Sequence, residues 1–282
     1  MNTIREISCD IIVDTVRGLF IEASTDLGED VLSAIKRAAE SEDSELGRYA
    51  LDKIIENAKI AKDTSLPLCQ DTGLAVVFVE VGQDVHITGD FNEAVQEGVR
   101  RAYRDGFLRK SICDPISREN TGDNTPAVIH TDIVKGNRIR IIAMPKGGGS
   151  ENMSSSVMLL PSSGIEGIKK HIVDMVEKAG PNPCPPTIVG VGIGGSIEKS
   201  ALLAKRALSR HVGEPNRSDS RLSELEREAL TEINALGIGP QGYGGKTTAL
   251  AVHVEMMPCH IASLPVTVNI QCHVARHREA II

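Results

Sequence analysis

The sequence is poor in aromatic residues and contains no tryptophan; 3 Tyr and 4 Phe occur among 282 residues. Its core must therefore be aliphatic, and it offers few stacking platforms for nucleic-acid bases. The formal net charge of −7 gives no electrostatic reason to bind nucleic acid or an anionic membrane. No apolar run has the length of a transmembrane helix, and the N-terminus MNTIREISCD lacks the pattern of a signal peptide. We expect a cytoplasmic protein whose partners include neither nucleic acid nor membrane.

No C-x-x-C pair occurs among the 6 cysteines, which excludes a zinc ribbon and a thioredoxin motif. Disulfides are not expected in the cytoplasm, and a scattered thiol is most often a small buried apolar group. We assign that structural role to Cys9, Cys113 and Cys259. Cys259 is the residue most easily confused with a ligand, because it lies next to His260 and could replace Cys272 in a set of thiolate ligands.

Three other cysteines lie on stiff, polar segments that are far apart in sequence. Cys69 is in PLCQDTG, Cys184 is in NPCPP, and Cys272 follows an apolar, strand-like run. Iron–sulfur clusters are held by thiolates, and a cluster with three protein ligands keeps one iron open as a Lewis acid. The three segments are compatible with one such site.

The apolar patterns predict a mixed α/β or α+β fold, with a helical lead-in followed by mixed sheets and flanking helices. We treat the chain as a single domain, with residues 1–62 as the lead-in and 63–282 as the cluster-binding core. Residues 127–134 and 138–144 are predicted to form a strand pair around a Lys-Gly-Asn turn. The other expected strands are 74–81, 187–193, 248–254 and 266–270, and the other expected helices are 46–58, 91–104, 165–178, 196–208 and 221–236. Residues 213–220 (GEPNRSDS) are predicted to be an exposed loop.

Two glycine-rich stretches resemble nucleotide-binding motifs. Gly190, Gly192 and Gly195 fit G-x-G-x-x-G between a predicted strand and helix, but no acidic strand end follows at the required distance. A dinucleotide site is therefore kept only as an alternative, although the helix start can still bind an anion. In GYGGKTT the position that a P-loop requires to be glycine is Pro240, so the Walker pattern fails. Lys246 is then either a solvated lysine or one that faces an anion.

Six long motifs follow one another in order: PLCQDTG, NTGDNTPAVIHTDIV, PKGGGSEN, NPCPPTIVGVGIGGSIEKSALLAKRAL, LGIGPQGYGGKTTALAVHVE and PCHIASLPVTVNIQCHVARH. Together they resemble the N-terminal domain, or α subunit, of class I fumarate hydratases, to which the α subunits of L-tartrate dehydratases are similar. The resemblance runs from Cys69 to the C-terminus, whereas residues 1–60 match only as a helical lead-in. It implies a hydro-lyase, an enzyme that adds water across a carbon–carbon double bond.

The resemblance also implies a cofactor and a partner. In that family, cysteines at the positions of Cys69, Cys184 and Cys272 bind a 4Fe–4S cluster. The remaining site residues come from a further domain or a separate β subunit, which is absent from this chain. We therefore expect a hetero-oligomer whose active site is completed by a β subunit.

The positions that surround the dicarboxylate substrate in the family correspond here to Gln70, Asp71, Arg109, Gly148 and His260. Asp71 and His260 would be catalytic, and the other three would bind substrate. The residue types fit, because a carboxylate beside a cluster ligand can handle a proton and a guanidinium can grip a carboxylate. The ordinary alternatives are a turn-forming Asp71, a surface Arg109 and a core His260. His273 and His277 are expected at the surface or at an interface.

The run from Lys146 to Asn152 reads KGGGSEN, which resembles the fumarase version, whereas the tartrate enzymes lack the lysine and the Ser-Glu-Asn run. We therefore expect fumarate hydration, as in the tricarboxylic acid cycle, with L-tartrate dehydration as the alternative. Three alternatives of another kind stay open. The chain could be a non-catalytic iron–sulfur subunit, a nucleotide-binding domain, or a scaffold for a catalytic partner.

Overall fold

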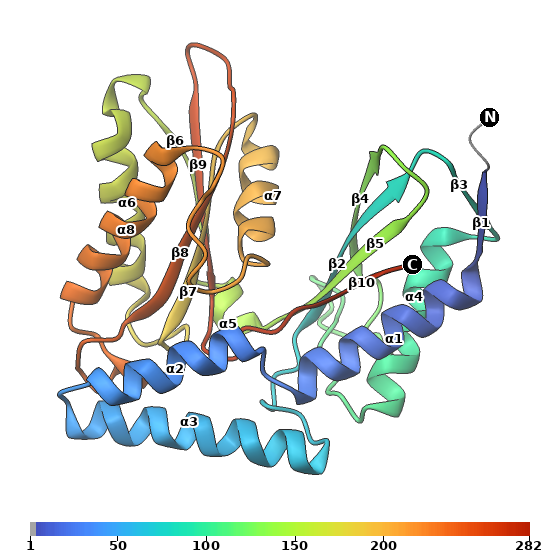
Figure 1. Cartoon of the computed structure of the whole chain (residues 1–282), viewed down its shortest axis with the longest axis horizontal. Coiled ribbons are helices and arrows are strands. Elements are labelled where there is room, and N and C mark those ends of the chain that lie inside the picture. Colours follow the sequence, from blue (N-terminus) through green and yellow to red (C-terminus); the bar gives the residue numbers. More distant parts are fainter. Residues whose placement is uncertain (1–3) are drawn as a thin grey trace. The chain divides into compact units, whose positions relative to one another are not determined.

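The computed structural model describes residues 4–282 as a mixture of helices and strands, which confirms the predicted fold class (Figure 1). All the predicted helices and strands are present. The strands β1, β3, β6 and β10 and the short helical turns α5, η1 and η2 were not predicted. None of the helices in residues 4–282 combines the length and the apolar character needed to cross a bilayer. The elements in chain order are β1 (Arg5–Ser8), α1 (Cys9–Thr25), α2 (Glu29–Ser41), α3 (Glu45–Thr64), β2 (Leu74–Gly82), β3 (Val85–Thr88), α4 (Phe91–Asp105), β4 (Val128–Val134), β5 (Ile139–Lys146), α5 (Gly148–Glu151), β6 (Ser155–Leu159), η1 (Pro161–Ser163), α6 (Gly164–Ala179), β7 (Thr187–Gly194), α7 (Ile197–Ala207), α8 (Ser220–Ala235), η2 (Pro240–Gly242), β8 (Ala249–Met257), β9 (Leu264–Gln271) and β10 (Arg278–Ile281).

The described chain divides into two compact units. Unit 1 contains residues 4–28, 58–148 and 276–282, and unit 2 contains residues 29–57 and 149–275. Each unit has its own four-stranded sheet, and unit 1 also has a small parallel pair, β1 and β3. The expectation of one domain, divided into a lead-in (1–62) and a cluster-binding core (63–282), stays a prediction.

In unit 1 the strand order is β10-β5-β2-β4, so β4 and β5 are not partners. The predicted strand pair is therefore wrong. Strand β2 lies between them, parallel to β4 and antiparallel to β5. The connecting turn passes over the end of β2, where a side chain on Gly82 would overlap the carbonyl oxygen of Gly136. A short turn between two strands normally gives a hairpin, but here its arms bond to a third strand instead.

The core of unit 1 forms where α1 and α4 pack on its sheet. Val13 and Val16 of α1 and Val95 and Val99 of α4 are buried against aliphatic residues of β2 and β5. The two helices lie close together because α4 has Gly98 at their contact, where a Cβ would lie 2.7 Å from the Cβ of Val16. This packing holds the sheet from which the loop at residues 69–73 and the glycine loop at 147–148 emerge.

In unit 2 the strand order is β6-β9-β7-β8, with β7 parallel to β8 and antiparallel to β9. The two faces of this sheet differ, as the strand period of two requires. Alternate valines and isoleucines of β7, β8 and β9 form an apolar core with α6 and α8. Helix α7 lies on the opposite face of this sheet from α6 and α8 (Figure 1). That face carries small and polar groups, including a contact of 2.8 Å between the hydroxyl groups of Ser200 and Thr267.

The G-x-G-x-x-G stretch does form the predicted strand, turn and helix. Two of its glycines, Gly190 and Gly192, face α7 on β7. A Cβ at Gly192 would overlap the carbonyl oxygen of Ser200, and one at Gly190 would overlap that of Ala204. These two glycines thus allow the close approach of α7 to β7, which explains them without a dinucleotide.

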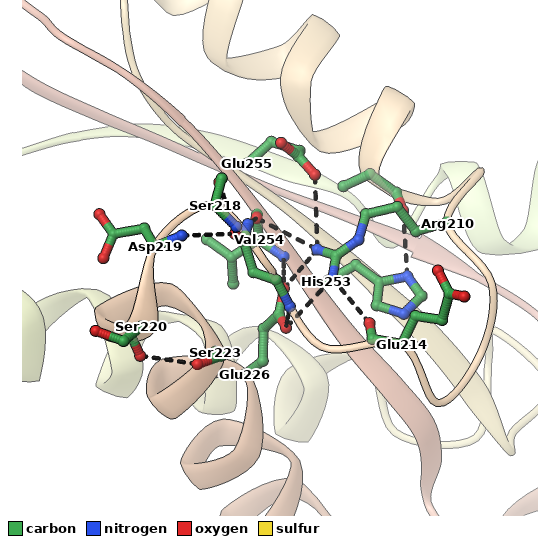
Figure 2. A network of polar contacts seen from close by, with 12 residues as sticks. Arg210, Glu214, Ser218, Asp219, Ser220, Ser223, Glu226, His253, Val254 and Glu255 are labelled. Atoms are coloured by element: carbon green, nitrogen blue, oxygen red, sulfur yellow. Dashed lines mark hydrogen bonds and ion pairs between the residues drawn. The ribbon is translucent and has the colours of Figure 1, made fainter.

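The free edge of β8 is covered by a polar network, which Figure 2 shows. The buried Glu226 carboxylate accepts hydrogen bonds from the Val254 amide (2.8 Å), the Asn216 amide (2.8 Å) and the Arg210 guanidinium (2.6 Å). The Asn216 side chain donates to the Val254 carbonyl at 2.9 Å. The loop at 213–219 is exposed as predicted, except that Asn216 turns inward. Backbone groups that an edge strand leaves unpaired are therefore satisfied by side chains.

The GYGGKTT stretch binds a carboxylate of its own chain. Glu42, between α2 and α3, is fully buried and accepts hydrogen bonds from the amides of Asp43 and Ser44 (both 3.1 Å), Lys246 (2.9 Å) and Thr247 (3.2 Å). Burial raises the pKa of this carboxyl, but the backbone hydrogen bonds outweigh burial and hold its pKa below the ordinary value. The Lys246 ammonium is exposed and pairs with Asp43. Of the two roles proposed for Lys246, the structure therefore supports the solvated one.

Replacing Glu42 with Gln is expected to lower the free energy of unfolding by about 2 kcal/mol at pH 7, because an amide cannot accept from all these donors. The folded-state pKa is depressed, so the contribution is fully present above the unfolded pKa of about 4.3 and is lost as the pH falls through the folded pKa. Urea unfolding of both proteins at several pH values measures this difference. A difference that does not shrink on acidification would contradict the account, and Glu40→Gln on the exposed side of α2 is the control.

Candidate active site

In unit 1, Asp71 is held by two backbone amides from different loops. Its Oδ1 accepts a hydrogen bond from the Gly73 amide at 2.9 Å, and its Oδ2 accepts one from the Gly148 amide at 2.8 Å. Gly73 has a φ of 76°, and a Cβ there would lie 2.6 Å from the carbonyl of Lys146. Asp71 is therefore a turn-former, as one alternative held, and it also joins the predicted substrate residue Gly148 to the Cys69 loop.

Polar side chains from the interior of unit 1 hold the backbone of this loop in place. The Tyr103 hydroxyl lies 2.8 Å from the Thr72 carbonyl and 2.9 Å from that of Gly73, while Asn124 donates to the same Gly73 carbonyl at 3.2 Å. Burial raises the pKa of Tyr103, so the phenol stays protonated as a donor. Thr72 in turn donates to the Arg109 carbonyl at 2.9 Å. The segments that contain Tyr103, Arg109 and Asn124, which are separate in the sequence, therefore meet around the Asp71 turn.

The side chains at the tip of this turn point outward. Gln70 and Arg109 are exposed and Cys69 is partly exposed. The Arg109 guanidinium forms no hydrogen bond or ion pair with residues 4–282, although its carbonyl is fixed by Thr72. A guanidinium placed in this way is available for a carboxylate that is not part of the chain.

In unit 2, Cys184 and Cys272 are brought together by strand pairing. Cys184 comes before β7 and Cys272 directly follows β9, and these strands are antiparallel with Ile188 opposite Gln271. The His273 amide donates to the Cys184 carbonyl at 3.2 Å. Cys184 has a φ of 56° and is exposed, and Cys272 is half-buried. Two of the three predicted thiolate ligands are therefore neighbours in one unit.

The loop at 237–245 completes this end of the unit 2 sheet. Both the amide and the side-chain nitrogen of Gln241 donate to the Pro185 carbonyl, at 2.8 and 2.7 Å. The Gln241 side chain also lies 3.1 Å from Nδ1 of His273. The loops that contain Cys184, Gln241 and His273 therefore contact one another at this end of the sheet.

His260 and Cys259 lie at the opposite end of the same strand. They belong to the loop that precedes β9, where Nδ1 of His260 accepts from the Ala262 amide at 3.1 Å and the Cys259 thiol lies 3.1 Å from the Ser263 carbonyl. The eight residues of β9 separate this loop from Cys272 by about 25 Å. Within unit 2, Cys259 is therefore not in a position to replace Cys272, and His260 is not beside the thiol pair.

The buried structural role assigned to Cys9, Cys113 and Cys259 is met only in part, because Cys9 and Cys113 are partly buried. For Cys259 it is wrong, since this thiol is exposed in the loop that precedes β9. Cys9 begins α1, and burial, with help from Asp90 and Asp10, raises the pKa of its thiol. Cys113 takes part in an isolated bridge with Asn120. Within residues 4–282 no three His, Cys, Asp or Glu side chains are arranged as ligands of a metal ion. Cys69 belongs to unit 1 and the thiol pair to unit 2, so the three-thiolate set stays a prediction.

Sequence reasoning missed the residues that support the loop from inside. Tyr103 was expected only as part of the helix 91–104, and Asn124 only as part of the motif NTGDNTPAVIHTDIV. Arg276 is 2% exposed although it lies between His273 and His277, which were expected at the surface or at an interface. One signal was available, because Arg276 directly follows the small apolar pair Val274-Ala275.

A fluorogenic reagent that must alkylate two adjacent thiols is expected to react with the cluster-free chain through Cys184 and Cys272. In a Cys69→Ser background, the further changes Cys184→Ser or Cys272→Ser should each abolish the fluorescence, because either removes one member of the pair. Cys259→Ser is the matched control and should leave the signal intact. Loss of signal in that control would contradict the placement of the two thiols.

Known proteins are similar to this chain over most of its length. Residues 13–281 match the family model described as Fumarate hydratase (Fumerase). The "Putative L(+)-tartrate dehydratase subunit alpha" of Methanocaldococcus jannaschii is 46% identical over 268 residues, which cover 93% of this chain and 94% of that protein. The "L(+)-tartrate dehydratase subunit alpha" of Escherichia coli (strain K12) is 31% identical over 92% of this chain and 86% of its own. The predicted resemblance is confirmed, and the chain belongs to the class I fumarate hydratase family of hydro-lyases.

Proposed function

We propose that this chain is the α subunit of a two-subunit hydro-lyase that acts on a four-carbon dicarboxylate, with L-tartrate as the first candidate substrate. The family match supports the reaction class, and the similar proteins, which are named as tartrate dehydratase α subunits, support both the subunit role and the substrate. The observation that carries the proposal is the Asp71 turn, where a fixed carboxylate, a half-exposed cysteine and an unpaired arginine share one support.

The proposed cofactor is a 4Fe–4S cluster held by Cys69, Cys184 and Cys272. The adjacent Cys184 and Cys272 segments fit two of its ligands, and Cys69 is the one thiol on the loop that carries Asp71. When bound, a cluster with three protein ligands supplies a Lewis-acidic iron with an open coordination position.

The chain's own residues have separate tasks in this proposal. Arg109 and Gln70 bind the carboxylate end of the substrate, and the Gly147–Gly148 backbone borders it. Asp71 moves the proton next to the carboxylate, because its oxygens are fixed by two amides rather than free to rotate. His260 stays a prediction of the resemblance alone, since no contact in unit 2 links it to the thiol pair.

Fumarate is the second candidate substrate, and the observation that favours it is the KGGGSEN run. Part of that run has another explanation in the structure. Glu151 forms an ion pair with Lys205 and accepts a hydrogen bond from Asn269 at 3.1 Å, so it is a packing residue of unit 2. Lys146 is fully buried at the end of β5. Structural roles therefore explain Lys146 and Glu151, and the KGGGSEN run is weaker support for fumarate than the sequence alone suggested. The similarity to tartrate dehydratase α subunits is the stronger support, and it favours L-tartrate.

The substrate proposal predicts that the chain, assembled anaerobically with its β subunit, converts L-tartrate to oxaloacetate with a higher kcat/KM than it hydrates fumarate. L-tartrate and fumarate differ from each other only at the two central carbons. The two activities should therefore be compared on the same preparation. The α chain alone should be inactive with either acid, because its half of the site lacks the partner's groups. Faster hydration of fumarate would instead support the second candidate, and no activity with either would contradict the proposal.

Replacing Asp71 with Asn is expected to lower kcat by about 10² to 10⁴-fold, because the side-chain amide cannot accept the proton and can accept from only one of the Gly73 and Gly148 amides. Steady-state assays on the assembled protein measure this, together with its iron content. Asp63→Asn, at an exposed position of α3, is the matched control and should behave as the wild type. Full activity of the Asp71 variant would remove Asp71 from the proton transfer.

A further inference from the structure

Arg276 is the largest of the fully buried side chains and carries a permanent charge. It directly precedes His277 and β10, four residues after Cys272 in sequence. Burying an ionised group is unfavourable unless it is paired and hydrogen-bonded. Its burial therefore calls for an explanation in terms of its partners.

The partners of Arg276 are few. Nη2 donates to the Asp71 carbonyl at 2.9 Å, whereas Nε and Nη1 are buried and have no hydrogen-bond partner among residues 4–282. Arg278, two residues further on, shows what a structural arginine in the same segment does. All three of its nitrogens are bonded, to the Glu22 carboxylate (2.7 Å), the Asp26 carbonyl (2.9 Å) and the His277 carbonyl (3.1 Å).

The single bond of Arg276 is made to the residue that the proposed reaction depends on most. The Asp71 carboxylate faces the Gly73 and Gly148 amides, and its carbonyl faces Arg276. The guanidinium also borders the glycine loop, since a Cβ built on Gly147 would lie 3.7 Å from Nη2 and 3.3 Å from Oδ2 of Asp71. Arg276 therefore bonds to the Asp71 peptide and lies beside the segment whose Gly148 amide holds the Asp71 carboxylate.

Among the groups that hold the Asp71 turn, Arg276 is the charged one. Tyr103 and Asn124 bond to the carbonyls of Thr72 and Gly73, which follow Asp71, so they fix the turn after the carboxylate. Arg276 instead bonds to the carbonyl of Asp71 itself. A charge-assisted bond is stronger than a neutral one, and here it sets the direction from which the side chain leaves the backbone.

We propose, on the basis of the hydro-lyase function above, that Arg276 is a positioning residue of the active site. Its guanidinium holds the Asp71 peptide and the glycine loop in register, so that the Asp71 carboxylate stays bonded to the Gly148 amide while it exchanges a proton with the substrate. Arg276 acts through Asp71 and not by contact with the substrate. Its loss should therefore affect turnover more than binding.

The test compares Arg276→Met, Arg276→Lys and the matched control Arg278→Met in the assembled α–β protein under anaerobic conditions. Arg276→Met should lower kcat about 100-fold, the effect of a displaced catalytic group, with KM roughly unchanged and iron content as in the wild type. Arg276→Lys keeps the charge but cannot make the same fork, so it should be impaired as well. Arg278→Met should keep wild-type turnover, even where it lowers the melting temperature.

Hydrogen exchange provides a measurement that does not depend on activity. The Gly73 and Gly148 amides bond to Asp71, so both should exchange faster in the Arg276 variants and at the wild-type rate in Arg278→Met. Wild-type exchange and wild-type kcat in an Arg276 variant would overturn the inference, as would a raised KM with kcat unchanged. If Arg276→Met does not assemble, Arg276→Lys decides by the same criteria.

These measurements separate the inference from the function on which it rests. The wild-type complex could lack hydro-lyase activity while the Gly148 amide still exchanges faster in the Arg276 variants. That result would reject the proposed function and keep the role of Arg276 in holding the turn. An active wild type with an indistinguishable Arg276→Met would reject the inference alone.

Discussion

The antiparallel register of β7 and β9 is the constraint on which the proposed cluster site depends. With Ile188 opposite Gln271, the residues before β7 and after β9 must meet at one end of the sheet, and these residues are the Cys184 and Cys272 segments. A shift of one residue would move the alternating apolar side chains of the shifted strand out of the core with α6 and α8, so the hydrophobic pattern protects the register. The same register places Cys259 and His260 at the far end of the sheet.

The Asp71 turn shows how unit 1 combines a rigid support with an accessible tip. Its backbone carbonyls bond to Tyr103, Asn124 and Arg276, all of them buried. Gln70 and Arg109 extend outward from the same support. A loop of this kind can hold a carboxylate within a narrow range of geometries and still expose its binding groups to a substrate or a partner subunit.

Much of the fold followed from the sequence because its long helices and buried strands have strong periodicity. The failures have physical reasons. Residues 127–134 and 138–144 were predicted to pair because only a short turn separates them, but pairing with β2, some fifty residues earlier in the chain, prevails. The glycines of GVGIGGS and the amides of GYGGKTT looked like ligand-binding groups, yet they accommodate α7 and the Glu42 carboxylate. At the site, the sequence motifs identified exposed candidates such as Gln70 and Arg109. Tyr103, Asn124 and Arg276 could not be found in this way, because they act through contacts between residues far apart in sequence, which no local pattern shows.

The measurement that tests the account most directly is the iron and sulfide content of the anaerobically reconstituted α–β protein and its cysteine variants. The account predicts about four irons and about four sulfides per α chain in the wild type and in Cys259→Ser. It predicts loss of the cluster in Cys69→Ser, Cys184→Ser and Cys272→Ser. A wild type that binds no cluster, or a cluster that depends on Cys259 rather than Cys272, would contradict it.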